Sequence, residues 1–143
     1  MTVMGRLAAR LLPFGVQRFF YYAYQKGKAR MFGCVFCQVA SGEKPASIVY
    51  EDELCVAFDD IHPRAPVHVL VVPRKHIASL NQGTEDEALL GRLLRAAADV
   101  ARKKGIDGSG FRVVVNTNGE GGQTVFHLHL HVLGGRFMKW PPG

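Results

Sequence analysis

The chain has 143 residues, of which 48% are hydrophobic, and its formal net charge is +6. This length fits one domain with a substantial core and excludes two. The positive charge lies entirely in residues 1–30, which hold six basic and no acidic residues, whereas residues 31–143 hold twelve of each. A nucleic-acid-binding function is not indicated, because residues 31–143 are neutral and do not interleave aromatic with basic side chains.

Residues 1–30 are expected to form a leader ahead of the domain. Arg10, Pro13 and Arg18 interrupt its apolar stretches too often for a membrane-spanning helix or a secretory signal. A mitochondrial transit peptide would explain the arginines and the missing acids. An amphipathic helix, lying on a membrane surface or on its own domain, would explain the aromatic cluster at 19–24. The expected location is therefore mitochondrial, or else cytoplasmic or membrane-associated.

The three cysteines, Cys34, Cys37 and Cys55, form no disulfide-rich pattern, which favours a reducing compartment. Cys34 and Cys37 form a C-x-x-C pair that could supply two thiolates to a metal. Two unligated buried cysteines are the alternative, since free cysteine is commonly buried without a role. Cys55 lies on an expected strand and is assigned to the core.

The first half of the domain predicts strands followed by one long helix. Residues 46–58 indicate a hairpin around a Glu-Asp turn, and 68–73 indicates a buried strand ended by a proline. Thr84 and Glu87 then form a capping box that opens an amphipathic helix. Its apolar stripe consists of Leu89, Leu90, Leu93, Leu94, Ala97, Val100 and Ala101.

The second half predicts two more strands, 111–116 and 125–133, joined by a glycine-rich loop at 118–124. Strands therefore dominate and only one helix is long. The expected class is α+β, with a mostly antiparallel sheet and the long helix packed on one face.

The last strand carries an unusual pattern, FHLHLHVL. Because side chains alternate along a strand, His127, His129 and His131 are expected on one face and the apolar residues on the other. A single strand histidine is usually a half-buried, hydrogen-bonded side chain. Three at this spacing are disfavoured by desolvation and mutual repulsion, which a metal or an anionic substrate would have to offset.

The sequence contains candidate groups for binding a metal and for binding an anionic substrate. Two histidines would complete a tetrahedral zinc site with Cys34 and Cys37, in a spacing unlike that of a nucleic-acid-binding finger. The glycine-rich loop offers backbone N–H groups to an anion and runs directly into imidazoles that could act as nucleophiles.

The segment HLHLHVL at 127–133 resembles the His-x-His-x-His signature of the histidine triad (HIT) family of nucleotide hydrolases and transferases. The resemblance extends from about Phe32 to Gly143 and includes AFDDIHPRAPVHVLVVPRKHI and GGQTVFHLHLHVLGGR. The terminal WPPG is similar to the Hint branch, the nucleoside phosphoramidate hydrolases. The resemblance implies a HIT-like fold for 31–143.

The same resemblance implies a reaction and a set of substrate-binding residues. His129 would attack the α-phosphorus of an adenosine or guanosine 5′-phosphoramidate, His131 would hold the phosphate, and Thr124 would serve the leaving nitrogen. The implied nucleotide-binding residues are Asp60, Ile61, Asn116, Gly122, Gln123, Thr124, His129 and His131. Alternatives are a dinucleoside polyphosphate hydrolase or nucleotidyl transferase on the same fold, or a non-catalytic nucleotide-binding adaptor.

Zinc-containing members of the family imply structural zinc, held here by Cys34, Cys37, His68 and His127. His62 is a rival fourth ligand or a substrate-pocket residue, and His76 is expected to be exposed or at a helix start. Members of this branch are homodimers, and Trp140, which has little local core to enter, is expected at the rim that the dimer builds.

Overall fold

Five antiparallel strands form one sheet in the order β1-β2-β3-β5-β4. The strands are β1 (Ile48–Glu51), β2 (Cys55–Asp59), β3 (Val67–Pro73), β4 (Phe111–Val114) and β5 (Leu130–Gly134). The computed structural model describes residues 33–143, so the leader and its expected transit or membrane role lie outside the described residues. Within that range, no helix has both the length and the apolar character needed to cross a membrane.

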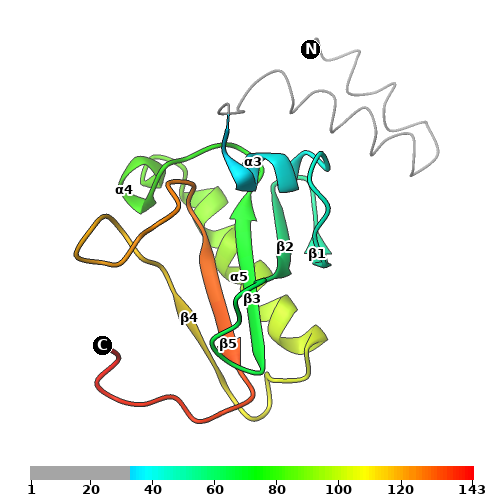
Figure 1. Ribbon diagram of the computed structural model, residues 1–143, viewed down its shortest axis with the longest axis vertical. Helices are drawn as coiled ribbons and strands as arrows, with labels where there is room; N and C mark the ends of the chain where they lie inside the picture. The colour runs from blue at the N-terminus through cyan, green and yellow to red at the C-terminus, as the bar shows by residue number, and fades with distance from the viewer. Residues whose placement is uncertain (1–32) are drawn as a thin grey trace, which may run out of the picture.

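Among residues 33–143, three helices accompany the sheet: α3 (Val35–Ala40), α4 (Leu80–Gly83) and α5 (Glu87–Lys103). Figure 1 shows α5 running behind the sheet and α3 at the end of the sheet where β3 finishes. Asp86 caps α5, because its side chain accepts a hydrogen bond from Leu89 N. The predicted capping box is therefore wrong, since Thr84 precedes the cap by two residues.

The two faces of the sheet pack against different helices. On one face, apolar residues from β2, β3 and β5 pack with the buried stripe of α5, whose members include Leu93, Ala97 and Val100. On the other face, Val56, Phe58, Leu70 and Val72 pack with α3. The α+β class with one long helix on an antiparallel sheet is confirmed. Leu94 alone of the predicted stripe points outward, with 57% of its surface exposed.

The strand predicted at 125–133 forms its ladder only from Leu130. The partner strand β3 ends at Pro73, which has no N–H to donate, and the Pro73 carbonyl accepts instead from the His127 ring nitrogen Nε2 at 2.8 Å. Beyond this point Leu128 N donates to Ile77 O at 2.6 Å. Alternation still holds from residue 127 onward, because Leu128 and Leu130 pack in the α5 core while the histidines lie on the α3 side.

Candidate active site and metal cluster

Two clusters of polar side chains lie on the α3 side of the sheet. Within each cluster the candidate ligand atoms are all within 4.8 Å of one another. The first cluster comprises Cys34, Cys37, His76 and His127, and the second comprises Asp60, His68 and His131. His129 lies between them in sequence and packs against His131, with 5.0 Å between the ring centroids.

The first cluster is formed by three separate segments. Cys34 is the N-cap of α3 and Cys37 lies in its first turn, so one short helix presents both sulfur atoms. The Nδ1 atom of His127 lies 3.4 Å from Cys34 Sγ and 3.5 Å from Cys37 Sγ. The Nδ1 atom of His76 lies 3.3 Å from Cys37 Sγ and 3.2 Å from His127 Nδ1.

The proton of His127 is not at the centre of this cluster. Burial lowers the pKa of His127 to about 4, so the ring is neutral near pH 7. Its one N–H is at Nε2, which donates to the Pro73 carbonyl. Nδ1 therefore presents a lone pair to two sulfur atoms and a second imidazole, an arrangement that favours a cation among them.

The spacing within the cluster fits a tetrahedral metal. With Zn–S near 2.3 Å and Zn–N near 2.0 Å, tetrahedral geometry places two nitrogens about 3.3 Å apart and a sulfur and a nitrogen about 3.5 Å apart. The observed separations of 3.2 Å and 3.3–3.5 Å are close to both values. Two thiolates and two imidazoles are also the donor set that zinc prefers in structural sites.

The fourth member of this cluster is His76, in place of the predicted His68. In the antiparallel register His68 lies opposite Leu133, at the far end of β5 from His127. His76 follows the end of β3, on the side where the chain approaches 127. His76 is accordingly half-buried rather than exposed, and the rival ligand His62 is exposed and belongs to neither cluster.

The second cluster is a directed chain of hydrogen bonds. Arg64 N donates to His68 Nδ1 at 3.0 Å, which leaves the His68 proton on Nε2. Burial lowers the pKa of His68 although the Asp60 carboxylate opposes the shift, so the ring is neutral. Its Nε2 lies 2.9 Å from His131 Nδ1 and 3.3 Å from Asp60 Oδ2.

This chain fixes the proton of His131. Burial, together with the neighbouring His129 and His68 rings, lowers the pKa of His131 to about 4. Because its Nδ1 accepts from His68, the single proton of the neutral ring is on Nε2. That Nε2 is buried and has no hydrogen-bond partner among residues 33–143. An unpartnered buried donor of this kind is suited to an oxygen atom of a bound anion.

His129 is oriented in the opposite sense. Its Nδ1 lies 2.7 Å from the His127 carbonyl oxygen, to which it must donate. Burial lowers the pKa of His129, and a neutral ring that donates through Nδ1 has a lone pair at Nε2. The site thus pairs a nucleophilic nitrogen on one ring with an N–H donor on the next.

Comparisons with known proteins identify the family of this chain. A family model described as the HIT domain matches residues 41–138. The chain belongs to the HIT family. An uncharacterised HIT-like protein of Synechocystis is 56% identical over 110 residues, which are 76% of this chain and 96% of that protein.

Two solved structures extend the comparison of the HIT domain. The crystal structure of a HIT family hydrolase from Legionella pneumophila is 49% identical with a TM-score of 0.75, covering 78% of this chain and all of that one. A histidine triad nucleotide-binding protein from Candida albicans is 28% identical with a TM-score of 0.66, covering 76% of this chain and 83% of that one.

The glycine-rich loop of the HIT domain is closed by its own hydrogen bonds. The Gln123 side chain donates to Ala78 O at 2.8 Å and Val125 O at 3.1 Å and accepts from Asn118 N at 3.0 Å. The backbone N–H groups of Gly122 and Gln123 donate to carbonyls within the loop. The backbone donors that Gly122 and Gln123 are expected to offer a phosphate therefore have partners within the loop, and the role of these two residues in nucleotide binding stays a prediction.

Glycine is required where this loop turns. A Cβ atom on Gly121 would overlap the Thr117 carbonyl oxygen, and Gly122 has a φ of +81° that side chains rarely adopt. The loop ends in Thr124, which is exposed, directly before the histidine segment.

The other expected nucleotide-binding residues lie around the imidazoles of the HIT domain. The Asp60 carboxylate accepts from His62 N at 2.8 Å through Oδ1, while Oδ2 faces His68. Ile61 beside it is 86% exposed, an unusual position for isoleucine. Extending the β4–β5 register, in which Val114 is opposite His131, places Asn116 opposite His129.

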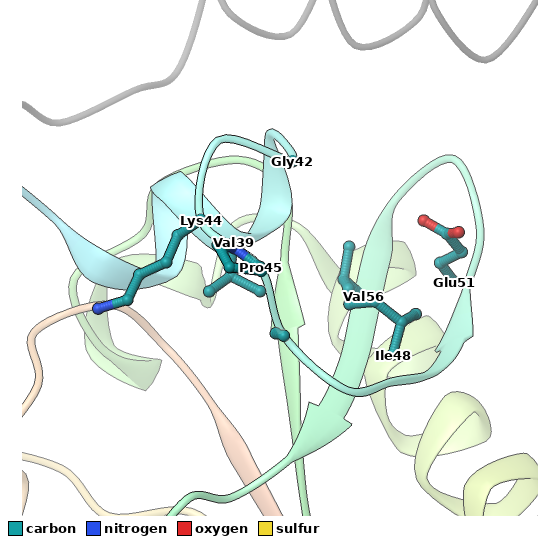
Figure 2. Close-up of a pocket in the computed structure, with 8 residues that line it drawn as sticks. Val39, Gly42, Lys44, Pro45, Ile48, Glu51 and Val56 are labelled. Carbon is teal, nitrogen blue, oxygen red and sulfur yellow. The ribbon is translucent and has the colours of Figure 1, made fainter.

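A surface hollow lies apart from both clusters. It is formed between α3 and the β1–β2 hairpin, and none of the residues that line it belongs to either cluster (Figure 2). Val39, Pro45, Ile48 and Val56 supply its apolar lining, and Lys44 and Glu51 lie at its ends. None of the residues that line it is a histidine or a cysteine.

Proposed function

We propose that the protein is a Hint-branch hydrolase that cleaves the P–N bond of adenosine or guanosine 5′-phosphoramidates through a nucleotidyl-histidine intermediate. The observation that carries the proposal is the pair of opposed tautomers, with a lone pair on His129 Nε2 and an unpartnered N–H on His131 Nε2. The hydrolase named in the Legionella structure and the nucleotide-binding protein named in the Candida structure support this class.

In the first step, His129 Nε2 attacks the α-phosphorus and the P–N bond breaks. The leaving amine takes the bonding electron pair and a proton from solvent water, and the hydroxyl of Thr124 would serve this nitrogen. His131 would donate its Nε2–H to a non-bridging oxygen, where negative charge develops in the transition state. The product on the enzyme is a nucleotidyl-imidazole, which readily transfers its nucleotidyl group because imidazole is a good leaving group.

In the second step, water attacks the same phosphorus and the bond to His129 Nε2 breaks. The nucleoside 5′-monophosphate leaves and the imidazole regains its lone pair. The His127 carbonyl holds Nδ1–H of His129 throughout, so the same nitrogen attacks and departs. Asp60 and Ile61 would border the ribose and base, and Asn116 the opposite wall.

We propose Zn²⁺ as the metal of the Cys34, Cys37, His76 and His127 cluster. When bound, it would supply structural cross-linking and no Lewis-acid chemistry, because four protein ligands complete its coordination. The donor set and the spacing of the ligand atoms support this choice.

We also propose that the protein is a homodimer with exposed aromatic residues at the subunit boundary. Phe137 is fully exposed and Trp140 is 81% exposed, although large aromatic residues usually lie in a core or an interface. Residues 1–30 would act as the mitochondrial transit peptide or membrane-surface helix ahead of the domain. Light scattering of the purified protein tests the first statement, and localisation with residues 1–30 deleted tests the second.

The activity is tested with wild type and His129→Ala on adenosine 5′-phosphoramidate and on a diadenosine polyphosphate. We expect faster hydrolysis of the phosphoramidate and loss of turnover in the variant. A faster rate on the polyphosphate would favour the dinucleoside polyphosphate hydrolase alternative. Nucleotide binding without any hydrolysis by wild type would favour the alternative of a non-catalytic adaptor. Undiminished hydrolysis by His129→Ala would refute the assignment of His129 as the nucleophile.

A further inference from the structure

Phe36 links the metal cluster to the reacting histidine. It lies between Cys34 and Cys37 in sequence, in the first turn of α3, and both of these cysteines are cluster members. Its ring is edge-on to His129, with centroids 5.2 Å apart and an interplanar angle of 75°. It also meets His127 at 5.9 Å and Phe58 at 5.6 Å.

The position of α3 depends on contacts at both of its ends. A helix of six residues is too short to be stable alone and needs tertiary contacts. At its C-terminal end the Ala40 carbonyl accepts from the buried Arg74 guanidinium at 2.6 Å. At its N-terminal end the chain is joined to the sheet through the two sulfur atoms and His127. A metal bound to the cluster would therefore add a fixed point at the end of α3 that carries Phe36.

A second contact runs from the cluster to the same imidazole. The backbone carbonyl of His127 accepts the Nδ1–H of His129, while the His127 ring faces the sulfur atoms. The His129 ring is thus held by two contacts. Its Nδ1–H donates to the carbonyl of His127, and the Phe36 ring packs against it. Both contacts would loosen together if the cluster lost its cation.

We propose that the metal cluster positions the His129 ring, and that Phe36 is the positioning residue through which occupancy of the cluster reaches it. The identity of His129 as nucleophile rests on the proposed function, whereas the coupling between cluster, Phe36 and imidazole does not. Zinc would thereby set the rate of a reaction in which it takes no chemical part.

The test uses the full chain and compares Phe36→Leu with Val39→Ala. Val39 lies on the same helix and in the same buried cluster as Phe36 and has no ring contact with a histidine, so its truncation controls for loosened packing. Three quantities are measured: zinc content, the imidazole ¹⁵N NMR signals of His129 with and without zinc, and kcat and KM on adenosine 5′-phosphoramidate. The His129 signals are assigned from their loss in His129→Asn.

We expect removal of zinc from wild type to shift or broaden the His129 signals. Phe36→Leu should keep its zinc, show altered His129 signals while loaded, and lose roughly tenfold in kcat with KM within about twofold, because misplacement of a reacting group is costly. Val39→Ala should match wild type in all three quantities.

Three results would overturn the inference: no zinc bound by wild type, His129 signals that ignore both zinc and Phe36→Leu, or a raised KM with unchanged kcat. The last would make Phe36 a wall of the substrate pocket. Since the NMR measurement needs no substrate, altered signals in a protein without phosphoramidase activity would refute the proposed function and leave the coupling standing.

Discussion

The Nε2 atom of His68 lies 2.9 Å from Nδ1 of His131, so the proton of one imidazole determines the tautomer of the next. The backbone N–H of Arg64 occupies the other nitrogen of His68 and thereby gives the chain its direction. The backbone N–H of Arg64, acting through His68, therefore determines which nitrogen of His131 carries the proton proposed to be donated to the phosphate.

Replacing His68 with alanine should impair the reaction without removing a group that touches substrate. His131 would then be free to carry its proton on Nδ1, and the N–H aimed at the phosphate oxygen would be lost in part. We expect a fall in kcat of roughly tenfold or more, in line with the loss of one oriented donor. His62→Ala is the control, because His62 is exposed and belongs to neither cluster. An equal fall in kcat in both variants would contradict the role of the hydrogen bonds that run from Arg64 N through His68 to His131.

The fold could be predicted because its signals are local. The alternation of apolar residues around residue 130 and the apolar stripe that ends near Val100 predict which side chains are buried. The buried residues on the two faces of the sheet match this prediction. The capping box predicts too early a start for α5 because two cap-forming residues lie close together, and only the structure shows that the Asp86 side chain accepts from Leu89 N. The strand predicted at 125–133 begins too early because the missing N–H of Pro73 acts on a strand distant in sequence.

The site could be predicted only where its residues share one segment. His127, His129 and His131 are adjacent, so their common side follows from the period of a strand. The fourth member of the Cys/His cluster depends on strand register, and the pairing of Val71 with Leu130 brings residues after Pro73 toward His127. Antiparallel pairing of the two predicted strands was the available signal that would have indicated His76 over His68. The role of Gln123 as a loop clamp depends on Ala78, which no local pattern connects to it.

Stability should depend on pH through His131. Its pKa is about 4 in the folded protein, against about 6.5 in an unfolded chain, so the unfolded state binds more protons between these values. The free energy of unfolding should therefore be highest above pH 6.5 and decrease as pH falls toward 4, by up to about 3 kcal/mol from this group. Urea denaturation from pH 7.5 to 4 measures the slope, and His131→Asn should reduce it. An unchanged slope would show that other groups cause the dependence.

Gln123 should matter for stability more than for substrate contact. Its amide satisfies the carbonyls of Ala78 and Val125 and the N–H of Asn118. Gln123→Leu keeps the bulk but leaves these backbone groups without a partner, which should lower the free energy of unfolding by about 2–3 kcal/mol. Glu120→Ala, at an exposed position of the same loop, should change it by less than about 0.5 kcal/mol. Equal stabilities of the two variants by urea denaturation would argue against the clamp.

Metal content distinguishes the two histidines that compete for the fourth ligand position. His76→Ala removes a nitrogen that lies 3.2 Å from His127 Nδ1, so the variant should bind zinc weakly or not at all. His68→Ala should retain zinc at the wild-type ratio, because His68 bonds His131 on the far side of the triad. Cys37→Ser should behave like His76→Ala, since a hydroxyl is a poor zinc ligand. Zinc release measured with a chromogenic chelator after unfolding gives the ratio directly. Retention by His76→Ala together with loss by His68→Ala would reverse the assignment of the two imidazoles, and with it the separation of the metal cluster from the hydrogen-bonded chain that orients His131.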